Sequence, residues 1–307
     1  MDSIDLAVIG SGPSGLTAAI YAVRNGLKAE VFENKVVGGT PTTTHLIENY
    51  TGFTSITGEE LAKKMAEHAK ELGVKINFGE VKEIKEKKEG KNYFELDFEN
   101  KKIEAKAILL ATGTKEKELN VKGEKELKGK GVSYCPLCDG FFFKGKRVAV
   151  IGGGNSGAIA STYLSEICRE VILITNAGEL SAEKTYLKRI EGSKNVKVMY
   201  KLLTQEILGK EKVEGIKAKN TETGKIEEIK CDGVFIRIGV IPNNGLAKNL
   251  GIKLDKNGFI EVNERNETSL KGVFASGDIA GNEQQIIIAA GDGAKAAINV
   301  FRYLKGI

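Results

Sequence analysis

Two cysteines separated by two residues, Cys135 and Cys138, are the side chains of this sequence whose type and spacing most directly indicate chemistry. Thiols at this spacing can close a small, readily reduced disulfide, in which one thiolate is stabilised by its surroundings. A zinc half-site is the alternative, but it would need a second pair of ligands. Cys168 and Cys231 stand alone without a neighbouring histidine and are expected to be small buried hydrophobic side chains. The spacing therefore favours redox chemistry, no metal ligands are predicted, and a coincidental spacing stays open.

The composition narrows the classes of protein that could carry such a pair. The chain has 307 residues, enough for two domains, with 41% hydrophobic and 28% charged residues, a balance typical of globular proteins. The net charge of +5 is spread along the sequence, which argues against nucleic-acid binding. The acidic N-terminus is unlike a signal peptide, and no run reaches the ~18 apolar residues of a membrane span. A cytoplasmic protein without a membrane partner is expected.

An internal repeat accounts for part of the 37 glycines. An apolar strand followed by G-x-G-x-x-G occurs at 6–15 and again at 148–157. After each copy the pattern predicts a helix, at 16–25 and at 158–167, and then a second strand. The second strands are expected at 29–32 and 171–174. The repeated glycines are Gly10, Gly12 and Gly15 in the first copy and Gly152, Gly154 and Gly157 in the second.

The order of strand, turn, helix and strand is the setting of a dinucleotide-binding fingerprint. The first glycine makes the tight turn, the second lets a pyrophosphate approach the backbone, and the third lets helix and strand pack closely. Glu33 follows the second strand of the first copy, where an acid can hold the ribose hydroxyls of an adenosine. The sequence therefore predicts two nucleotide-binding turns.

The remaining patterns complete an α/β fold. A helix is predicted over 59–72, with Leu61, Met65, Ala69 and Leu72 on one face and His68 as an ordinary surface residue. The other expected elements are a hairpin of strands 94–98 and 103–106, a buried strand over 107–113, a strand over 272–278 and a final helix over 285–304. Two charge runs, 82–91 and 115–130, alternate in sign and are expected to be solvated loops or hairpins, with docking of an acidic partner as the alternative.

The repeat and the strand near the C-terminus predict two Rossmann-like domains, the second inserted into the first. The first domain comprises 1–114 and 242–307, and the second comprises 115–241 and carries the cysteine pair.

With these motifs in order, the chain resembles the low-molecular-weight thioredoxin reductases of the pyridine-nucleotide-disulfide oxidoreductase superfamily over nearly its whole length. The resemblance rests on both fingerprints and on the Cys135-x-x-Cys138-Asp139-Gly140 motif. It rests further on three shorter motifs, at 48–53, 111–113 and 277–278.

The resemblance implies FAD in the first domain and a defined role for each residue of the cysteine motif. Cys138 would lie against the flavin ring, Cys135 would attack the disulfide of a partner, and Asp139 would donate and accept the proton, with a helix or turn cap as the alternative for Asp139. The expected FAD-binding residues are Gly10, Gly12, Pro13, Ser14, Gly15, Glu33, Asn49, Val81, Thr112, Gly113, Gly277, Asp278, Gln285 and Ile286. A possible second nucleotide site comprises Gly152, Gly154, Asn155 and Gly157.

The family pattern breaks where NADPH would be recognised. NADPH-dependent members carry a His-Arg-Arg run and a further Arg after the second strand, because a 2′-phosphate favours bidentate cations. Here Thr175 begins the stretch 175–181, which contains no guanidinium. Gln284 replaces a second family arginine, and Thr40 stands where a glutamine beside the flavin is common.

We therefore expect a flavoprotein disulfide reductase that reduces thioredoxin or a thioredoxin-like protein, with reduced ferredoxin as the preferred electron donor. NADH, NADPH and a deazaflavin stay open as donors. The resemblance also suggests a homodimer and a rotation of the inserted domain on segments near Lys115 and Pro242. The alternatives are a small-molecule or peroxiredoxin-linked disulfide reductase and a redox-sensing flavin-binding module without turnover.

Overall fold

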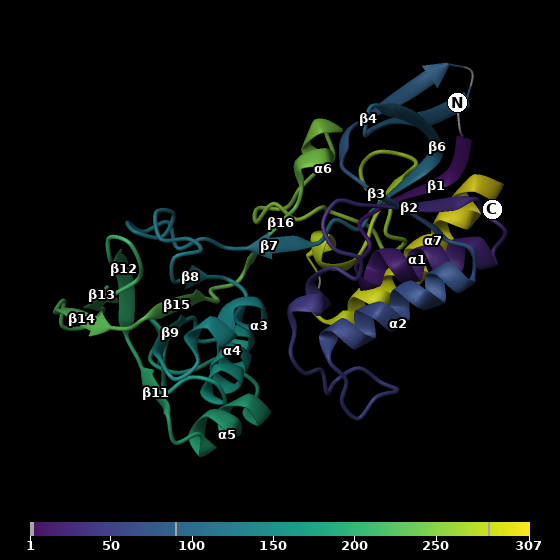
Figure 1. Ribbon diagram of the computed structural model, residues 1–307. Helices are drawn as coiled ribbons and strands as arrows, with labels where there is room; N and C mark the ends of the chain where they lie inside the picture. The colour runs from purple at the N-terminus through teal and green to yellow at the C-terminus, as the bar shows by residue number, and fades with distance from the viewer. Residues whose placement is uncertain (1–2, 90, 282) are drawn as a thin grey trace. The chain divides into compact units, whose positions relative to one another are not determined.

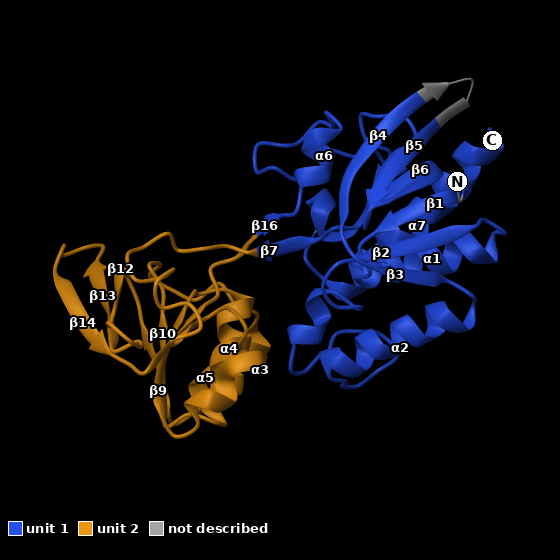
Figure 2. Cartoon of the chain, turned by 45° about the horizontal axis from the view of Figure 1, so that its top comes forward, with its two compact units in different colours: residues 1–115, 241–307 blue, residues 116–240 orange. Residues whose placement is uncertain are grey.

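A computed structural model describes residues 3–89, 91–281 and 283–307 of the chain. The chain forms two compact units (Figure 2): unit 1 comprises Met1–Lys115 and Ile241–Ile307, and unit 2 comprises Glu116–Val240. Unit 2 is inserted into unit 1, as expected, and each unit is an α/β domain of the Rossmann kind. The predicted domain limits each differ by one residue from those of the units.

Unit 1 is built on a sheet in the order β3-β2-β1-β6-β5-β4, with β17 paired to β6 (Figure 1). β1, β2, β3, β6 and β17 run parallel, whereas β4, β5 and β6 form an antiparallel meander. The strands are β1 (Ser3–Ile9), β2 (Ala29–Glu33), β3 (Lys75–Phe78), β4 (Val81–Glu89), β5 (Lys91–Phe98), β6 (Lys101–Leu110) and β17 (Val273–Ala275).

Apolar layers lie on both faces of this sheet. On one face, α1 (Pro13–Arg24), α2 (Gly58–Glu71) and α7 (Ile286–Lys305) contribute to a core with Val8, Leu109 and Phe274. On the other face, residues of β4, β5 and α6 (Gly245–Asn249) pack around Phe32 and Ile108. Residues from both segments of unit 1 thus pack on the same sheet. This shared packing holds the segments before and after the insertion together.

Unit 2 repeats the plan with a parallel sheet in the order β11-β10-β9-β15-β8 and a smaller antiparallel sheet of β12, β13 and β14. The helices α4 (Asn155–Ser165) and α5 (Lys184–Gly192) pack on one face of the parallel sheet, and the smaller sheet packs on the other. The strands are β8 (Val132–Ser133), β9 (Arg147–Ile151), β10 (Glu170–Ile174), β11 (Val196–Met199), β12 (Leu202–Leu208), β13 (Gly215–Asn220), β14 (Ile226–Lys230) and β15 (Gly233–Ile236).

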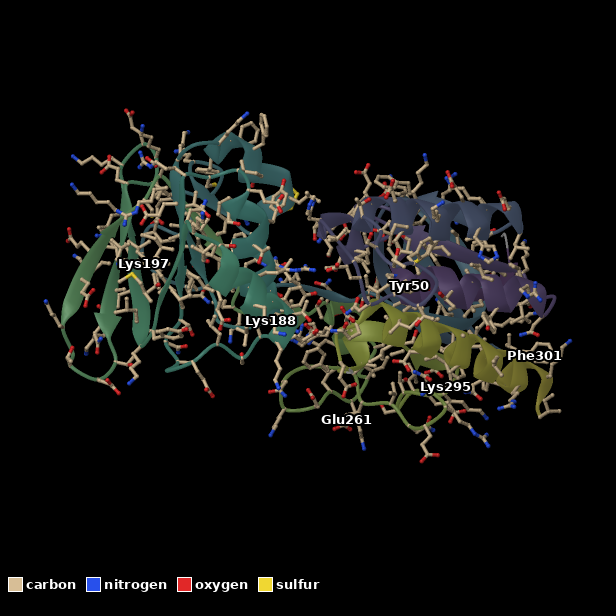
Figure 3. All side chains as sticks on the ribbon, turned by 90° about the horizontal axis from the view of Figure 1, so that it is seen from below. Tyr50, Lys188, Lys197, Glu261, Lys295 and Phe301 are labelled. Carbon is tan, nitrogen blue, oxygen red and sulfur yellow. A yellow bond between two sulfur atoms is a disulfide. The ribbon has the colours of Figure 1, made fainter. Side chains whose placement is uncertain are left out.

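The chain passes between the units twice, through β7 (Thr114–Glu116) and β16 (Val240–Pro242), which pair with each other. Figure 3 shows charged side chains distributed over both units, with Lys188 and Lys197 on unit 2 and Lys295 on unit 1. In the part of the chain that the structure describes, no helix combines the length and apolar character that a membrane crossing would require.

Several predicted elements have different limits. Helix α1 begins at Pro13 and α4 at Asn155, three residues earlier than expected in each case, because Gly12 and Gly154 act as N-caps. The predicted strands 103–106 and 107–113 are one strand, β6, which pairs with β5 along its first half and with β17 along its second. The hairpin turn is confined to Glu99 and Asn100, both at positive φ.

Two further expectations about burial are corrected. Leu61 and Ala69 of the predicted apolar face of α2 are buried, but Leu72 is 37% exposed because it lies beyond the helix as its C-cap. Glu124, inside a charge run expected to be solvated, is 1% exposed. The buried state of Cys168 and Cys231 and the surface position of His68 are confirmed.

The two glycine turns have the same local geometry. Gly10 and Gly152 adopt positive φ values of 107° and 135°. A Cβ on Gly15 would overlap the carbonyl oxygen of Gly10, and a Cβ on Gly157 would overlap that of Gly152. The third glycine of each turn therefore permits the close contact of helix and strand, whatever is bound there.

This geometry predicts different costs for two substitutions in unit 2. Gly157→Ala should destabilise unit 2 by about 1–3 kcal/mol, because the methyl group displaces α4 from β9. Gly154→Ala is the matched control, since the nearest atom to its Cβ is the Ser181 hydroxyl oxygen at 3.7 Å. Thermal unfolding followed by circular dichroism compares the two variants, and equal midpoints would contradict the assignment.

Candidate active site

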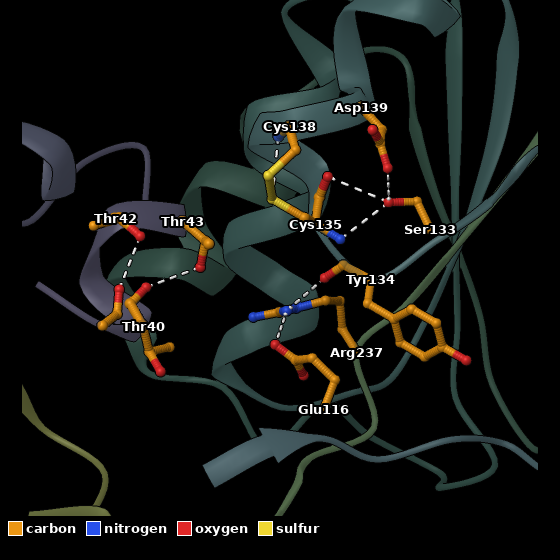
Figure 4. The surroundings of a disulfide bond; sticks show 11 residues. Thr40, Thr42, Thr43, Glu116, Ser133, Tyr134, Cys135, Cys138, Asp139 and Arg237 are labelled. Carbon is orange, nitrogen blue, oxygen red and sulfur yellow. Dashed lines mark hydrogen bonds and ion pairs between the residues drawn. A yellow bond between two sulfur atoms is a disulfide. The ribbon is translucent and has the colours of Figure 1, made fainter. Parts of the chain in front are cut away.

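The cysteine pair forms a disulfide at the start of a short helix. β8 leads into the Cys135–Cys138 disulfide, whose S–S bond is 2.04 Å long, and Cys135 is the N-cap of α3 (Pro136–Asp139) (Figure 4). The backbone N–H of Cys138 donates to Sγ of Cys135 at 3.1 Å. A donor directed at this sulfur stabilises negative charge on it, so Cys135 is the better placed of the two to be a nucleophilic thiolate. Cys138 is exposed and Cys135 is partly buried.

Asp139 lies at the end of α3 and is tied to the strand before the motif. Its Oδ2 accepts a hydrogen bond from the hydroxyl of Ser133 at 2.6 Å. The same hydroxyl oxygen accepts the backbone N–H of Cys135 at 3.0 Å. The side chain of Asp139 makes no capping hydrogen bond to the turn that follows, Gly140–Phe143. The alternative prediction of a turn cap is therefore wrong.

A second set of contacts fixes the backbone just before Cys135. Nη1 of Arg237 donates to the carbonyl oxygen of Tyr134 at 2.8 Å and to Glu116 at 2.5 Å (Figure 4). The hydroxyl of Tyr134 donates to Glu124 at 2.6 Å. Burial, followed by the bond to Glu124, raises the pKa of Tyr134 above its ordinary value. Tyr134 is thus held at both its carbonyl and its hydroxyl.

The buried Glu124 carboxylate also organises the segment that enters unit 2. It accepts the backbone N–H groups of Leu119 and Asn120 at 2.8 Å and 2.6 Å. Its charge is therefore compensated by backbone donors and by the Tyr134 hydroxyl. Sequence reasoning missed Ser133, Tyr134, Glu124 and Arg237, and only the first two could have been suspected, from their places beside Cys135.

In unit 1, Glu33 lies where the fingerprint predicts, at the end of β2. Its Oε2 accepts both the backbone N–H and the hydroxyl of Ser11, at 2.9 Å and 2.7 Å, and Oε1 accepts the N–H of Lys35 at 2.8 Å. Each carboxylate oxygen has further acceptor capacity. Glu33 therefore braces the glycine turn with its buried carboxylate.

The N-terminus of α1 is free to receive phosphate oxygens. Gly12 is its N-cap, no side chain caps the helix, and the first turn carries no acid. Among the described residues, no atom lies within 4 Å of a Cβ built on Gly12. The backbone N–H groups and the dipole of this 12-residue helix thus suit the diphosphate of FAD.

Other predicted FAD-binding residues come together in unit 1 from distant parts of the sequence. The hydroxyls of Ser14 and Ser276 are 2.6 Å apart, and a Cβ on Gly277 would contact the Ser14 side chain. Nδ2 of Asn49 donates to Oε1 of Gln285 at 3.0 Å. These contacts place the first turn beside the segment after β17, and Asn49 beside the start of α7.

Five other predicted FAD-binding residues also lie in unit 1. Thr112 exchanges two hydrogen bonds of 2.9 Å with Asn243, next to Gly113. Pro13 is buried as the first residue of α1, and Ile286 begins α7 and packs beside Ile47 and Ile56. Val81 is buried in the cluster that contains Phe32 and Phe98.

Asp278 has the most perturbed carboxyl of the predicted FAD-binding residues. It lies in the single turn Gly277–Ala280 directly after β17. Burial raises its pKa to about 6. A partly buried carboxyl at the edge of a parallel sheet is suited to hydrogen bonding with a hydroxyl-bearing ligand.

The second glycine turn offers a similar helix N-terminus, but the loop after β10, residues 175–181, contains no cation for a 2′-phosphate. The first turn of α4 carries no acid, and Asn155 exchanges hydrogen bonds of 2.9 Å and 2.8 Å with Glu183. Thr175 is buried, and its hydroxyl oxygen accepts the N–H of Ala177 at 3.2 Å. Lys201 approaches this loop at Gly178, but its ammonium is paired with Glu222 at 2.5 Å.

The described residues contain no group of three or more histidine, cysteine or acidic side chains that could hold a metal ion. Cys168 and Cys231 are also chemically distinct from the pair. Burial raises the pKa of Cys168 to about 11 and, together with the charge of Asp232, that of Cys231 to about 12.

Comparison with known proteins agrees with this arrangement. Residues 4–293 match the family model described as "Pyridine nucleotide-disulphide oxidoreductase". The chain is 40% identical over 303 residues to a thioredoxin reductase of Bacillus subtilis, covering 98% of this chain and 95% of the relative.

Solved structures of thioredoxin reductases are also similar to this chain. A thioredoxin reductase of Lactococcus lactis has a TM-score of 0.95 at 35% identity, covering 99% of this chain and 100% of the other. A ferredoxin-flavin thioredoxin reductase of Clostridium acetobutylicum has a TM-score of 0.54 at 31% identity, covering 100% of both chains.

The fold and the disulfide define a pyridine nucleotide-disulphide oxidoreductase, a flavoprotein disulfide reductase. Within that superfamily the chain belongs to the low-molecular-weight thioredoxin reductase family, whose members are FAD-dependent enzymes.

The carboxyl of Asp278 should make the stability of the FAD-free protein depend on pH. Its pKa is about 6 in the folded chain and near the ordinary, lower value in the unfolded chain. The stabilisation by the protonated form is therefore present at low pH and is lost as the pH rises through about 6. We therefore expect the unfolding free energy of Asp278→Asn minus that of wild type to increase by about 1–3 kcal/mol between about pH 4 and about pH 7. Urea unfolding measures the difference, and a pH-independent difference would exclude this role for Asp278.

Proposed function

We propose that this enzyme transfers electrons through FAD to the Cys135–Cys138 disulfide and from there to thioredoxin, with reduced ferredoxin as the electron donor. The observation that carries the proposal is the Cys135–Cys138 disulfide with a backbone donor on one sulfur and a hydrogen-bonded carboxyl beside it.

FAD would be held in unit 1. The open N-terminus of α1, at Gly12 and Pro13, supports binding of its diphosphate, and Ser14 and Gly15 continue this turn. We assign the ribose hydroxyls to Glu33 and the hydroxyl-bearing chain to Asp278. The remaining contacts are proposed at Gly10, Asn49, Val81, Thr112, Gly113, Gly277, Gln285 and Ile286. Bound FAD would supply the two electrons that reduce the disulfide.

Reduction of a partner disulfide requires two exchange steps. The Cys135 thiolate attacks one sulfur of the partner disulfide, forming a mixed disulfide and releasing the other partner sulfur as a thiolate. The proton that leaves the Cys135 thiol is taken up by the Asp139 carboxylate, which then gives it to the released partner thiolate. The Cys138 thiolate then attacks Sγ of Cys135, which re-forms the Cys135–Cys138 disulfide and releases the second partner thiolate. The partner gains the two electrons that the cysteine pair loses.

The surface next to the disulfide supports a protein substrate. Phe141 and Phe142 follow the cysteine motif directly and are 68% and 72% exposed. Two adjacent exposed aromatic rings are suited to contact with the surface of a partner protein. A small-molecule disulfide would not need so large an apolar contact. This favours a thioredoxin-like protein over a small-molecule disulfide. The family resemblance further supports a homodimer and a rotation of unit 2 on β7 and β16.

The electron donor is inferred from the residues at the position where the 2′-phosphate of NADPH would bind. Residues 175–181 contain no cation, and the ammonium of Lys201 is already paired with Glu222. Ferredoxin would need no nucleotide site and would support turnover without these contacts. One solved relative is a ferredoxin-flavin thioredoxin reductase. The second candidate is a nicotinamide donor, favoured by the intact turn at Gly152, Gly154 and Gly157 and by the uncapped N-terminus of α4.

An anaerobic titration distinguishes the donors. We expect reduced ferredoxin to bleach the flavin absorbance of the purified protein rapidly and NADPH to do so slowly, because charge-assisted bonds worth about 1.5–3 kcal/mol each are missing. NADH in a parallel titration tests the second candidate. Rapid bleaching by micromolar NADPH would overturn the ferredoxin proposal.

Substitution of one cysteine tests turnover itself. Cys135→Ser should abolish reduction of thioredoxin because no thiolate is left to form the mixed disulfide, while FAD binding and flavin reduction persist. The assay follows new thiols on thioredoxin, with Cys168→Ala as the matched control because Cys168 is buried. If wild type reduces thioredoxin no faster than Cys135→Ser, the protein is a redox-sensing module and not a reductase.

A further inference from the structure

Ser133 lies at the centre of the hydrogen bonds around the cysteine motif. It ends β8, pairs with Phe235 of β15 and is 5% exposed. Its hydroxyl oxygen is 2.6 Å from Oδ2 of Asp139, 3.0 Å from the backbone N of Cys135 and 3.3 Å from the carbonyl oxygen of Cys135 (Figure 4). The hydroxyl of Ser133, held on a buried strand, thus connects the Asp139 carboxyl to the backbone of Cys135.

A count of protons determines the direction of these bonds. The backbone N–H of Cys135 can only donate, so the Ser133 oxygen accepts from it. The single Ser133 proton then points to Oδ2 of Asp139, because that contact is much shorter than the one to the Cys135 carbonyl and leads to a carboxylate. Oδ1 of Asp139 has no hydrogen-bond partner among the residues that the structure describes.

We propose that Ser133 is a positioning residue for proton transfer in the disulfide exchange. By donating to Oδ2 it fixes the carboxyl and leaves Oδ1 as the oxygen that gives the proton to the departing partner thiolate. The Ser133 proton stays on its own oxygen throughout. This inference rests on the proposed function, since it assigns a role relative to Asp139.

The same hydroxyl also fixes the nucleophile. Its bond to the Cys135 N–H holds the residue that must approach the partner disulfide, while its bond to Asp139 holds the acid. The distance between acid and nucleophile is therefore set by one rigid, buried side chain. Placement of this kind acts on the chemical step more than on binding of the partner.

The test uses the FAD-loaded enzyme reduced beforehand with dithionite, so that it does not depend on the natural donor. Oxidised thioredoxin is mixed in anaerobically, and the rate of thiol formation is measured at several thioredoxin concentrations. We expect Ser133→Ala to lower the maximal rate roughly tenfold to a hundredfold, with the half-saturating thioredoxin concentration unchanged, since general acid catalysis contributes about 10²–10⁴-fold. Ser133→Thr, which keeps the hydroxyl, should recover most of the rate.

Two controls separate positioning from a structural effect. Ser161→Ala removes another fully buried hydroxyl of unit 2, one without a hydrogen-bond partner among the described residues, and should leave the rate unchanged. Asp139→Asn should be slow, and adding Ser133→Ala to it should slow the reaction by less than Ser133→Ala slows wild type, because part of the effect of the serine acts through the carboxyl. Thermal midpoints of all variants are measured alongside.

The outcomes are distinct. A slow Asp139→Asn with an unaffected Ser133→Ala, or equal loss in Ser133→Ala and Ser133→Thr, would overturn the role of Ser133. Rate losses that multiply in the double variant would do the same. An Asp139→Asn variant as fast as wild type would instead overturn the acid role of Asp139 on which the inference rests.

Discussion

The fold depends on a close approach between a helix and the strand before it, made once in each unit. In both glycine turns the third glycine lies against the carbonyl oxygen of the first, so no larger residue fits between helix and strand. The contact directs the N-terminus of the helix toward the edge of the sheet, where its backbone N–H groups lie open. The packing of the backbone thus leaves an open helix N-terminus in each unit, and in unit 1 the Glu33 carboxylate braces the turn before it.

Because that packing is local in sequence, much of it could be predicted. Two fingerprints, their helices and strands, and the position of Glu33 follow from residues within about 25 positions of each other. The limits of the elements were less accurate, since Gly12 and Gly154 start their helices earlier than the apolar pattern does. The two expected strands are continuous in β6, which pairs with β1 from Glu104 to Leu110 and with β17 from Ile108 to Leu110. Both partners lie far away in the sequence, where periodicity cannot indicate them.

The surroundings of the disulfide show the limit of sequence reasoning more clearly. The Cys-x-x-Cys-Asp motif predicts the reacting groups, but it gives no sign of Arg237, which reaches the backbone of Tyr134 from a distant strand end. Glu124 lies in a run of alternating charges that indicates a solvated loop, yet it is buried because backbone donors and Tyr134 surround it. Charge patterning describes an average environment, whereas each carboxylate responds to the donors that the fold gives it.

The buried cysteines, Cys168 and Cys231, have a practical consequence for measuring the redox state of the Cys135–Cys138 pair. With pKa values of about 11 and 12, only roughly one in ten thousand or fewer of these thiols is ionised near neutral pH. An alkylating reagent applied to the native enzyme would therefore modify Cys135 and Cys138 alone, and only after their disulfide has opened. Two labels per chain, read by mass, then report a reduced pair, one label reports the mixed disulfide with the partner, and no label reports the closed disulfide.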